Sequence, residues 1–162
     1  MSTTRSFLAA LSLVFLGGCS PGEWSPLDET TQELVVSEVM ERLDQYASDV
    51  TSKNLGAILS FWSDSGDFVF AGDGVVFGGF EDWAAVAKDD NDQTDTWNHW
   101  RWSEVNILPL SRHVASVTLE FDYEKVLLTG ETARGSGSWT YVMARTDSGW
   151  QVLHGNGHHI AR

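Results

Sequence analysis

The chain has 162 residues, of which 42% are hydrophobic and 12% aromatic, and its formal net charge at pH 7 is −13. This length and apolar content suit one globular domain and exclude a disordered or fibrous chain. The negative charge, without a cluster of Lys or Arg anywhere, excludes nucleic acid as a partner, because phosphate backbones are bound by basic surfaces.

The first residues have the composition of an export signal. Residues 1–5 are polar with one positive charge, and the apolar run at 7–16 is too short to span a bilayer. The run leads into Leu-Gly-Gly-Cys, ending at Cys19, which resembles the bacterial lipobox. We therefore expect residues 1–18 to be a lipoprotein signal peptide and Cys19 to be lipidated. The alternative is an ordinary secretory signal that happens to end beside a cysteine.

Cys19 is the only cysteine, so no internal disulfide can form. The lipobox resemblance implies more than one acyl chain, such as palmitate, which stable anchoring requires. Ser20, in place of aspartate, implies the outer membrane in a host with two membranes. Residues 19–27, with two prolines and a glycine, are expected to be a spacer, and residues 28–162 the domain.

Two helices are expected at the start of the domain. From Asp28 or Thr30, either of which can cap a helix, apolar residues recur every three or four positions to about residue 53. Residues 55–62 carry a second, shorter apolar face, and the polar run 63–66 ends it.

A short hairpin and a third helix are expected next. Two β-branched and aromatic runs, 67–70 and 75–77, flank a glycine-rich turn at 71–74. Residues 81–88 have the pattern of a helix, and we expect the acidic segment 89–95 to be a loop that ends it.

The rest of the chain predicts four long antiparallel strands, at 100–108, 114–126, 136–145 and 150–158, each rich in β-branched or aromatic residues. The order of helix, helix, hairpin, helix and four strands predicts an α+β fold. Three N-terminal helices should cover one face of a curved sheet.

Several residues in this order match a known pattern. They are Phe61-Trp62, the run Asp67 to Phe70, a glycine at 78 or 79, the run Val114 to Thr118, the run Thr140 to Arg145, Asp147, the run Gly149 to Val152, and His154. Over about residues 33–159 the chain resembles the SnoaL-like subgroup of the nuclear transport factor 2-like superfamily. The resemblance implies a cone-shaped antiparallel or mixed sheet wrapped around the helices, with a pocket at its open end, and a homodimer.

The last strand supplies the first candidate site. Strand alternation places His154, Asn156 and His158 on one face, and the resemblance turns that face toward the pocket. A pocket imidazole can serve as a general base near neutral pH. The alternative is that His154 only satisfies a hydrogen bond in the core.

This orientation depends on the register of the last hairpin. A three-residue loop with Gly149 in the left-handed conformation would place Trp150 opposite Thr146 and His154 opposite Val142. A slip by one residue would reverse the faces.

Other residues could take part in acid–base chemistry. Asn156 or Tyr141 is the candidate hydrogen-bond donor. Asp67, Asp73 and Glu104 are candidate carboxylates, since burial at a pocket rim raises a carboxyl pKa. The sequence around Asp73 also suits a plain turn, and Asp67 a strand start. We take His154, Tyr141 and Asp67 as the catalytic candidates.

A shared metal ion is not expected. Four residues along a strand separate His154 and His158 by roughly 13 Å, whereas both would have to bind zinc at about 2 Å. The pair His158-His159 would chelate metal only adventitiously. We predict neither a metal nor a cofactor.

The chain has eight tryptophans. Their rings suit a cavity for an apolar ligand, although they could equally fill the cone or a dimer face. The predicted ligand pocket comprises Trp62, Phe68, Phe70, Trp100, Trp102, Val142, Val152, Asn156 and His158.

Three functions remain open, because the fold alone selects none. The first is a lipid-anchored protein that binds a small apolar or aromatic molecule. The second is an isomerase, cyclase or dehydratase with a histidine base, and the third a homodimerising or partner-docking module. An enzyme needs a histidine within hydrogen-bond reach of an acid or hydroxyl facing one cavity, whereas a binding protein needs only the cavity.

Overall fold

The computed structural model describes residues 26–161, so the predicted signal peptide and Cys19 lie outside the described residues. Within this range no helix is long and apolar enough to cross a membrane. The elements follow in the order α1 (Glu29–Thr51), α2 (Leu55–Ser60), β1 (Val69–Gly72), β2 (Val75–Phe77), α3 (Phe80–Gln93), β3 (Thr94–Ser111), β4 (Val114–Leu127), β5 (Thr132–Thr146) and β6 (Gly149–Ala161).

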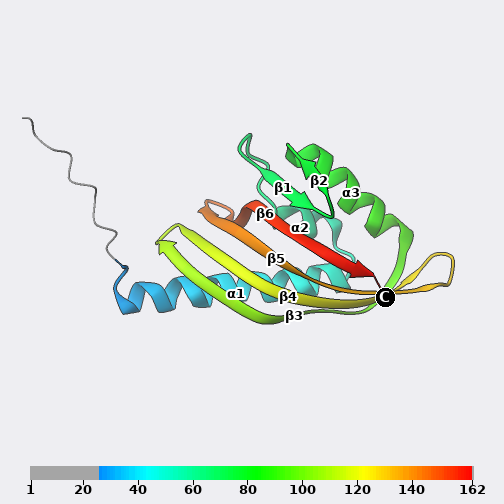
Figure 1. Cartoon of the computed structure of the whole chain (residues 1–162), viewed down its shortest axis with the longest axis horizontal. Coiled ribbons are helices and arrows are strands. Elements are labelled where there is room, and N and C mark those ends of the chain that lie inside the picture. The colour runs from blue at the N-terminus through cyan, green and yellow to red at the C-terminus, as the bar shows by residue number, and fades with distance from the viewer. Residues whose placement is uncertain (1–25, 162) are drawn as a thin grey trace, which may run out of the picture.

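Helix α1 is long and packs along one face of the sheet (Figure 1). Asp28 is its N-cap and accepts hydrogen bonds from the backbone N–H and the hydroxyl of Thr31. The apolar residues of one helical stripe are buried, namely Val35, Val39, Leu43, Tyr46 and Val50. The helix therefore has a single core-facing side, as its three- and four-residue spacing predicts.

The six strands form one curved sheet in the order β2-β1-β6-β5-β4-β3 (Figure 1). Neighbouring strands are antiparallel except β1 and β6, which are parallel. Register shifts bend β3 against β4, including one between Ser103 and Asn106, where Glu104 has a φ of 48°. The predicted α+β fold, with a cone-shaped mixed sheet around three helices, is confirmed.

Helix α3 is longer than predicted. It continues through the acidic segment to Gln93, so the prediction of a loop there is wrong. Lys88 pairs with Asp92, and the Gln93 side chain donates to Asp89, each one helical turn away. These contacts let a polar, acidic stretch remain helical.

The β5–β6 hairpin is one residue tighter than predicted. Thr146 pairs with Gly149, whose φ of 99° is left-handed as expected, so the loop has two residues rather than three. Trp150 consequently lies opposite Arg145.

A β-bulge in β6 then changes which side chains face inward. Val152 pairs with Met143, whereas His154 pairs with Val142 as predicted, which leaves Leu153 as the extra residue. The alternation of the strand restarts there.

The bulge turns the predicted site face outward. His154, Asn156 and His158 are exposed to solvent, so the prediction that they line the pocket is wrong. Gly155 and Gly157 face the interior instead, where a Cβ would collide with aromatic rings.

Candidate functional site

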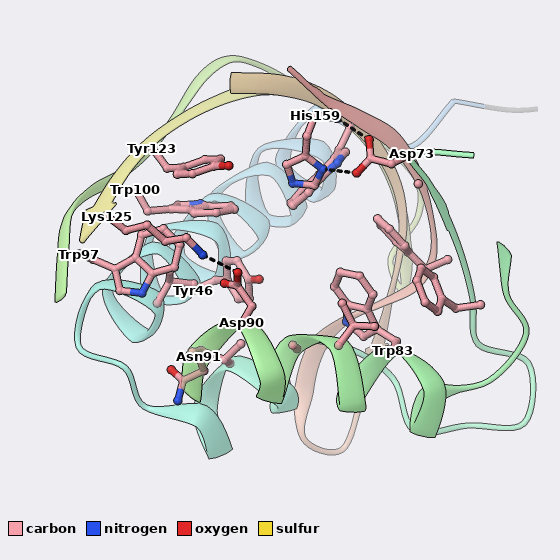
Figure 2. A pocket seen from close by; sticks show the side chains of 18 of the residues that line it. Tyr46, Asp73, Trp83, Asp90, Asn91, Trp97, Trp100, Tyr123, Lys125 and His159 are labelled. Atoms are coloured by element: carbon pink, nitrogen blue, oxygen red, sulfur yellow. Dashed lines mark hydrogen bonds and ion pairs between the residues drawn. The ribbon is translucent and has the colours of Figure 1, made fainter. Parts of the chain in front are cut away.

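A cavity of about 270 Å³ lies at the open end of the cone (Figure 2). Helix α3 and the β1–β2 hairpin form one side of it, and strands β3 to β6 form the other. Eight aromatic side chains line it, namely Tyr46, Phe70, Phe77, Trp83, Trp97, Trp100, Tyr123 and Trp139. Such walls suit a small ligand with a large apolar surface.

The sheet side of the cavity is a stack of rings. The indole of Trp100 lies nearly parallel to the rings of Phe121 and Tyr123, with centroid distances of 5.3 Å and 5.8 Å and interplanar angles of 9° and 13°. Trp97 meets Trp100 edge-on at 5.6 Å. The stack arises because these residues alternate on the inner faces of the paired strands β3 and β4.

The opposite side of the cavity is a helix without core residues. Trp83, Ala87 and Asp90 lie along the face of α3 that lines the cavity, and no residue of this helix is buried. The Trp83 ring packs against Phe70 at a centroid distance of 4.4 Å. Helix α3 thus covers the cavity and has few other contacts to hold it.

An aspartate–histidine pair lies at one side of the cavity. The carboxylate of Asp73 accepts hydrogen bonds from the backbone N–H of His159 and from its ring Nδ1, both at 2.7 Å. In Figure 2 the second ring nitrogen of His159 points into the cavity. Asp73 sits in the β1–β2 turn with a φ of 52°. Among residues 26–161 the other ring nitrogen makes no hydrogen bond, so the pair holds an imidazole with one nitrogen available beside an apolar space.

The electrostatics of the pair favour an ionised carboxylate. Partial burial acts to raise the pKa of Asp73, but the two hydrogen bonds from His159, with the charge that its ring carries when protonated, outweigh it and lower the pKa below the ordinary 3.8. Asp73 then accepts the Nδ1 proton and fixes the ring tautomer.

A lysine–aspartate pair lies across the cavity from His159 (Figure 2). Lys125 of β4 forms an ion pair with Asp90 of α3. The Lys125 ammonium also lies 4.8 Å from the centroid of the Trp97 ring. Burial, followed by the charges of Asp90 and Asp73, raises the pKa of Tyr123, so its hydroxyl stays protonated.

Acid is expected to destabilise the fold. Asp122 resembles Asp73: burial raises its pKa, but hydrogen bonds from Arg101 and His99 lower it more. A carboxyl whose folded pKa is depressed contributes stability above its unfolded pKa of about 4, and this contribution is lost as pH falls through the folded value. Thermal unfolding followed by circular dichroism should show a midpoint that falls from pH 5 to pH 2.5, and less steeply in Asp73→Asn. A constant midpoint would contradict this assignment.

The structure separates the predicted pocket residues into two groups. Phe70 and Trp100 line the cavity. Trp62, Phe68 and Val152 are buried in the core and do not line it, so their predicted place in the pocket is wrong. Their side chains pack in the hydrophobic core of the cone, next to the residues that line the cavity.

Trp102 and Val142 also lie outside the cavity lining. Trp102 is half-buried and its indole N–H donates to the Leu43 carbonyl at 2.9 Å, which joins β3 to α1. Val142 is half-buried on the outer side of β5, because the buried Tyr141 and Met143 flank it in the strand.

The other catalytic candidates lie away from the cavity lining as well. Tyr141 is fully buried, burial raises its pKa well above the ordinary value, and its hydroxyl has no hydrogen-bond partner within residues 26–161. Asp67 is exposed before β1, and Glu104 is exposed in the β3 bulge. Of the carboxylates considered, Asp73 is at the cavity.

Metal-binding side chains are dispersed in the described part of the chain. Between residues 26 and 161, no three His, Cys, Asp or Glu side chains come close enough to hold one ion. The groups at the cavity instead form two separate pairs, one suited to proton transfer and one to charge recognition.

Sequence comparison identifies the domain type. A family model described as "SnoaL-like domain" matches residues 39–159. No curated protein sequence matches the chain.

Solved structures share the fold at low sequence identity. A protein from Novosphingobium aromaticivorans, provisionally assigned as a scytalone dehydratase, aligns with a TM-score of 0.72 and 9% identity over 81% of this chain and 87% of its own. A nuclear transport factor 2-like superfamily protein from Salmonella enterica serovar Typhimurium gives 0.66 and 15%, over 80% and 92%. A ketosteroid isomerase-like protein from Erwinia carotovora atroseptica gives 0.63 and 15%, over 84% and 100%. These likenesses establish the fold alone.

Proposed function

Because the chain belongs to the SnoaL-like domain family, whose model matches residues 39–159, we propose that it binds a small, largely apolar or aromatic molecule in its cone. The observation that carries this proposal is the cavity of about 270 Å³ with eight aromatic side chains in its walls. The aromatic rings already pack against one another without a ligand. Binding therefore immobilises few additional side chains, and the entropy cost of binding is small.

Native mass spectrometry of the full chain, purified in mild detergent from its own host, tests this proposal. We expect a bound small molecule that is released when the protein unfolds. Ala87→Trp, which fills the cavity from α3, should abolish the complex, whereas Ala85→Trp on the exposed face of the same helix should keep it. Equal occupancy in both variants would place the ligand elsewhere and refute the proposal.

A second candidate function is proton transfer, which the Asp73–His159 pair favours. The pair meets the requirement for a histidine that contacts an acid and faces a cavity, although the histidine is His159 and not the predicted His154. With Nδ1 held by Asp73, the free ring nitrogen can remove a proton from a bound carbon acid. Returning that proton to another atom completes an isomerisation, and giving it to a leaving hydroxyl completes a dehydration.

Deuterium incorporation into the molecule recovered with the protein tests the second candidate. In D₂O, the native chain should exchange an acidic C–H of that molecule, and His159→Asn should slow the exchange strongly while binding persists. If the exchange proceeds at the same rate in His159→Asn, His159 is not the base, and the proton-transfer function is rejected in favour of binding alone.

The proposed location is a membrane surface, through lipid on Cys19. The sequence that ends at Cys19 supports this, and the domain begins only nine residues later with the N-cap Asp28. The cavity lies near the C-terminal end of α1, because Tyr46 lines it. Along the helix axis, Tyr46 is about 26 Å from Glu29, the first residue of α1. The cavity would then open away from the bilayer.

Membrane fractionation of Cys19→Ser tests the anchor, since this variant should become soluble. Continued membrane association would refute lipidation at Cys19. The homodimer expected from the family resemblance stays a prediction, and light scattering of the purified chain over a range of concentrations tests it.

A further inference from the structure

Lys125 is a buried charge in an aromatic cavity. The side chain is 8% exposed, yet it comes from the inner face of β4 and lines the cavity. An ammonium group can donate three hydrogen bonds, and within residues 26–161 its one acceptor is the Asp90 carboxylate. A buried ammonium needs an anionic partner, because isolating it from both water and a counter-charge is costly.

The two members of the Lys125–Asp90 pair are unequal in their access to water. The Asp90 side chain is 53% exposed and belongs to α3, which buries no residue. Asp90 can therefore lose its partner at little cost, because water can hydrate its carboxylate. Lys125 is buried, so it cannot exchange its partner for water in the same way. A ligand carboxylate could take the place of Asp90, keep Lys125 paired and let Asp90 hydrate.

The same inequality weighs against a cationic ligand, although aromatic cages often bind ammonium groups. A cation that recruited Asp90 would leave Lys125 buried without a partner, which is the costly arrangement. Asp73, the other carboxylate at the cavity, already accepts two hydrogen bonds from His159.

From these contacts we infer that the ligand of the cavity is an organic anion, with a carboxylate or similar group bound by Lys125 and an aromatic or apolar body against the Trp100–Tyr123 stack. This inference rests on the proposed binding function and specifies its ligand class. Lys125 is the anchoring residue, and Asp90 is an internal competitor for the same site.

Calorimetric titration of the full chain with 2-naphthoate and 2-naphthamide tests the inference, because the two molecules have nearly the same shape and differ in charge. Naphthoate should bind roughly tenfold or more tightly than naphthamide, as expected for a charge-assisted hydrogen bond. Lys125→Met should remove this difference by weakening naphthoate while leaving naphthamide within about threefold.

Asp90→Asn provides an independent test that leaves Lys125 in place. It should strengthen naphthoate binding several-fold, since the competing carboxylate is gone. The matched control is Asp92→Asn, which removes a charge from the same helix at an exposed residue paired with Lys88 and should change neither affinity.

The outcomes separate this inference from the proposed function. Equal binding of the two probes, or an Asp90→Asn variant that binds naphthoate no better, would overturn the anionic ligand class while keeping an apolar binding site. Tighter binding of 2-naphthylmethylammonium than of naphthoate would also overturn it. Failure of all three probes to bind would count against the cavity as a ligand site altogether.

Discussion

Replacing Trp62 by alanine is expected to lower the free energy of unfolding by about 3–5 kcal/mol, in the range for large aromatic residues cut from a core. Trp62 is 1% exposed, and its ring meets those of Phe61, Phe70 and Tyr141 edge-on at 5.3, 5.5 and 5.7 Å. These ring contacts hold the Trp62 side chain, so the loss is mainly one of packing.

Urea unfolding followed by tryptophan fluorescence and circular dichroism measures this change. Leu128→Ala, at a side chain 68% exposed, should cost little and serves as the control. A Trp62→Ala variant as stable as Leu128→Ala would mean that Trp62 is not part of the core.

Gly157→Ala is expected to destabilise the protein by about 1–3 kcal/mol, although it adds a single methyl group. The new Cβ would lie 2.8 Å from Cγ of Trp139 and closer still to the Ser138 carbonyl oxygen. Both belong to the neighbouring strand β5, so relief requires β5 and β6 to move apart. Since Trp139 also lines the cavity, ligand binding should weaken with stability.

Gly78→Ala is the matched control for Gly157→Ala. A Cβ at Gly78 meets no atom within 4 Å, and neither glycine has a positive φ. Both variants reduce the freedom of the unfolded chain equally, so their difference reports the steric clash alone. Comparable melting temperatures for the two would contradict the close packing of β6 against Trp139.

The sequence was sufficient to predict the fold because local patterns and global packing agree. The stripe from Val35 to Val50 marked α1, and the glycine-rich turn at 71–74 marked the hairpin. The end of α3 was missed because acidic residues after Lys88 have weak helix propensity, and the contacts that keep them helical depend on pairs one turn apart.

The candidate site was harder to predict, because it depends on the direction of individual side chains. One extra residue, Leu153, turned His154 outward and His159 inward. The glycines at 155 and 157 are compatible with a bulge but do not fix its position. Lys125 was accessible to sequence reasoning. Strand alternation places it on the same face as Phe121 and Tyr123, which indicates an inward-facing lysine.

The two polar pairs at the cavity come from segments far apart in the chain. The β1–β2 turn meets the end of β6 to form one pair, and α3 meets β4 to form the other. Between them lies the stacked surface of Trp100 and Tyr123. This arrangement could hold a flat molecule by its faces, anchor one end at Lys125 and present the other to His159.

The most direct test of the cavity as a binding site is a ¹H–¹⁵N spectrum of the tryptophan indole groups during titration with 2-naphthoate. We expect the signals of Trp83, Trp97 and Trp100 to shift, while that of Trp150 stays unchanged. Trp150 lies away from the cavity lining, and its indole donates to Glu38 at 3.0 Å. Unchanged signals from the three cavity tryptophans at saturating naphthoate, or shifts confined to Trp150, would show that the cavity does not bind the ligand.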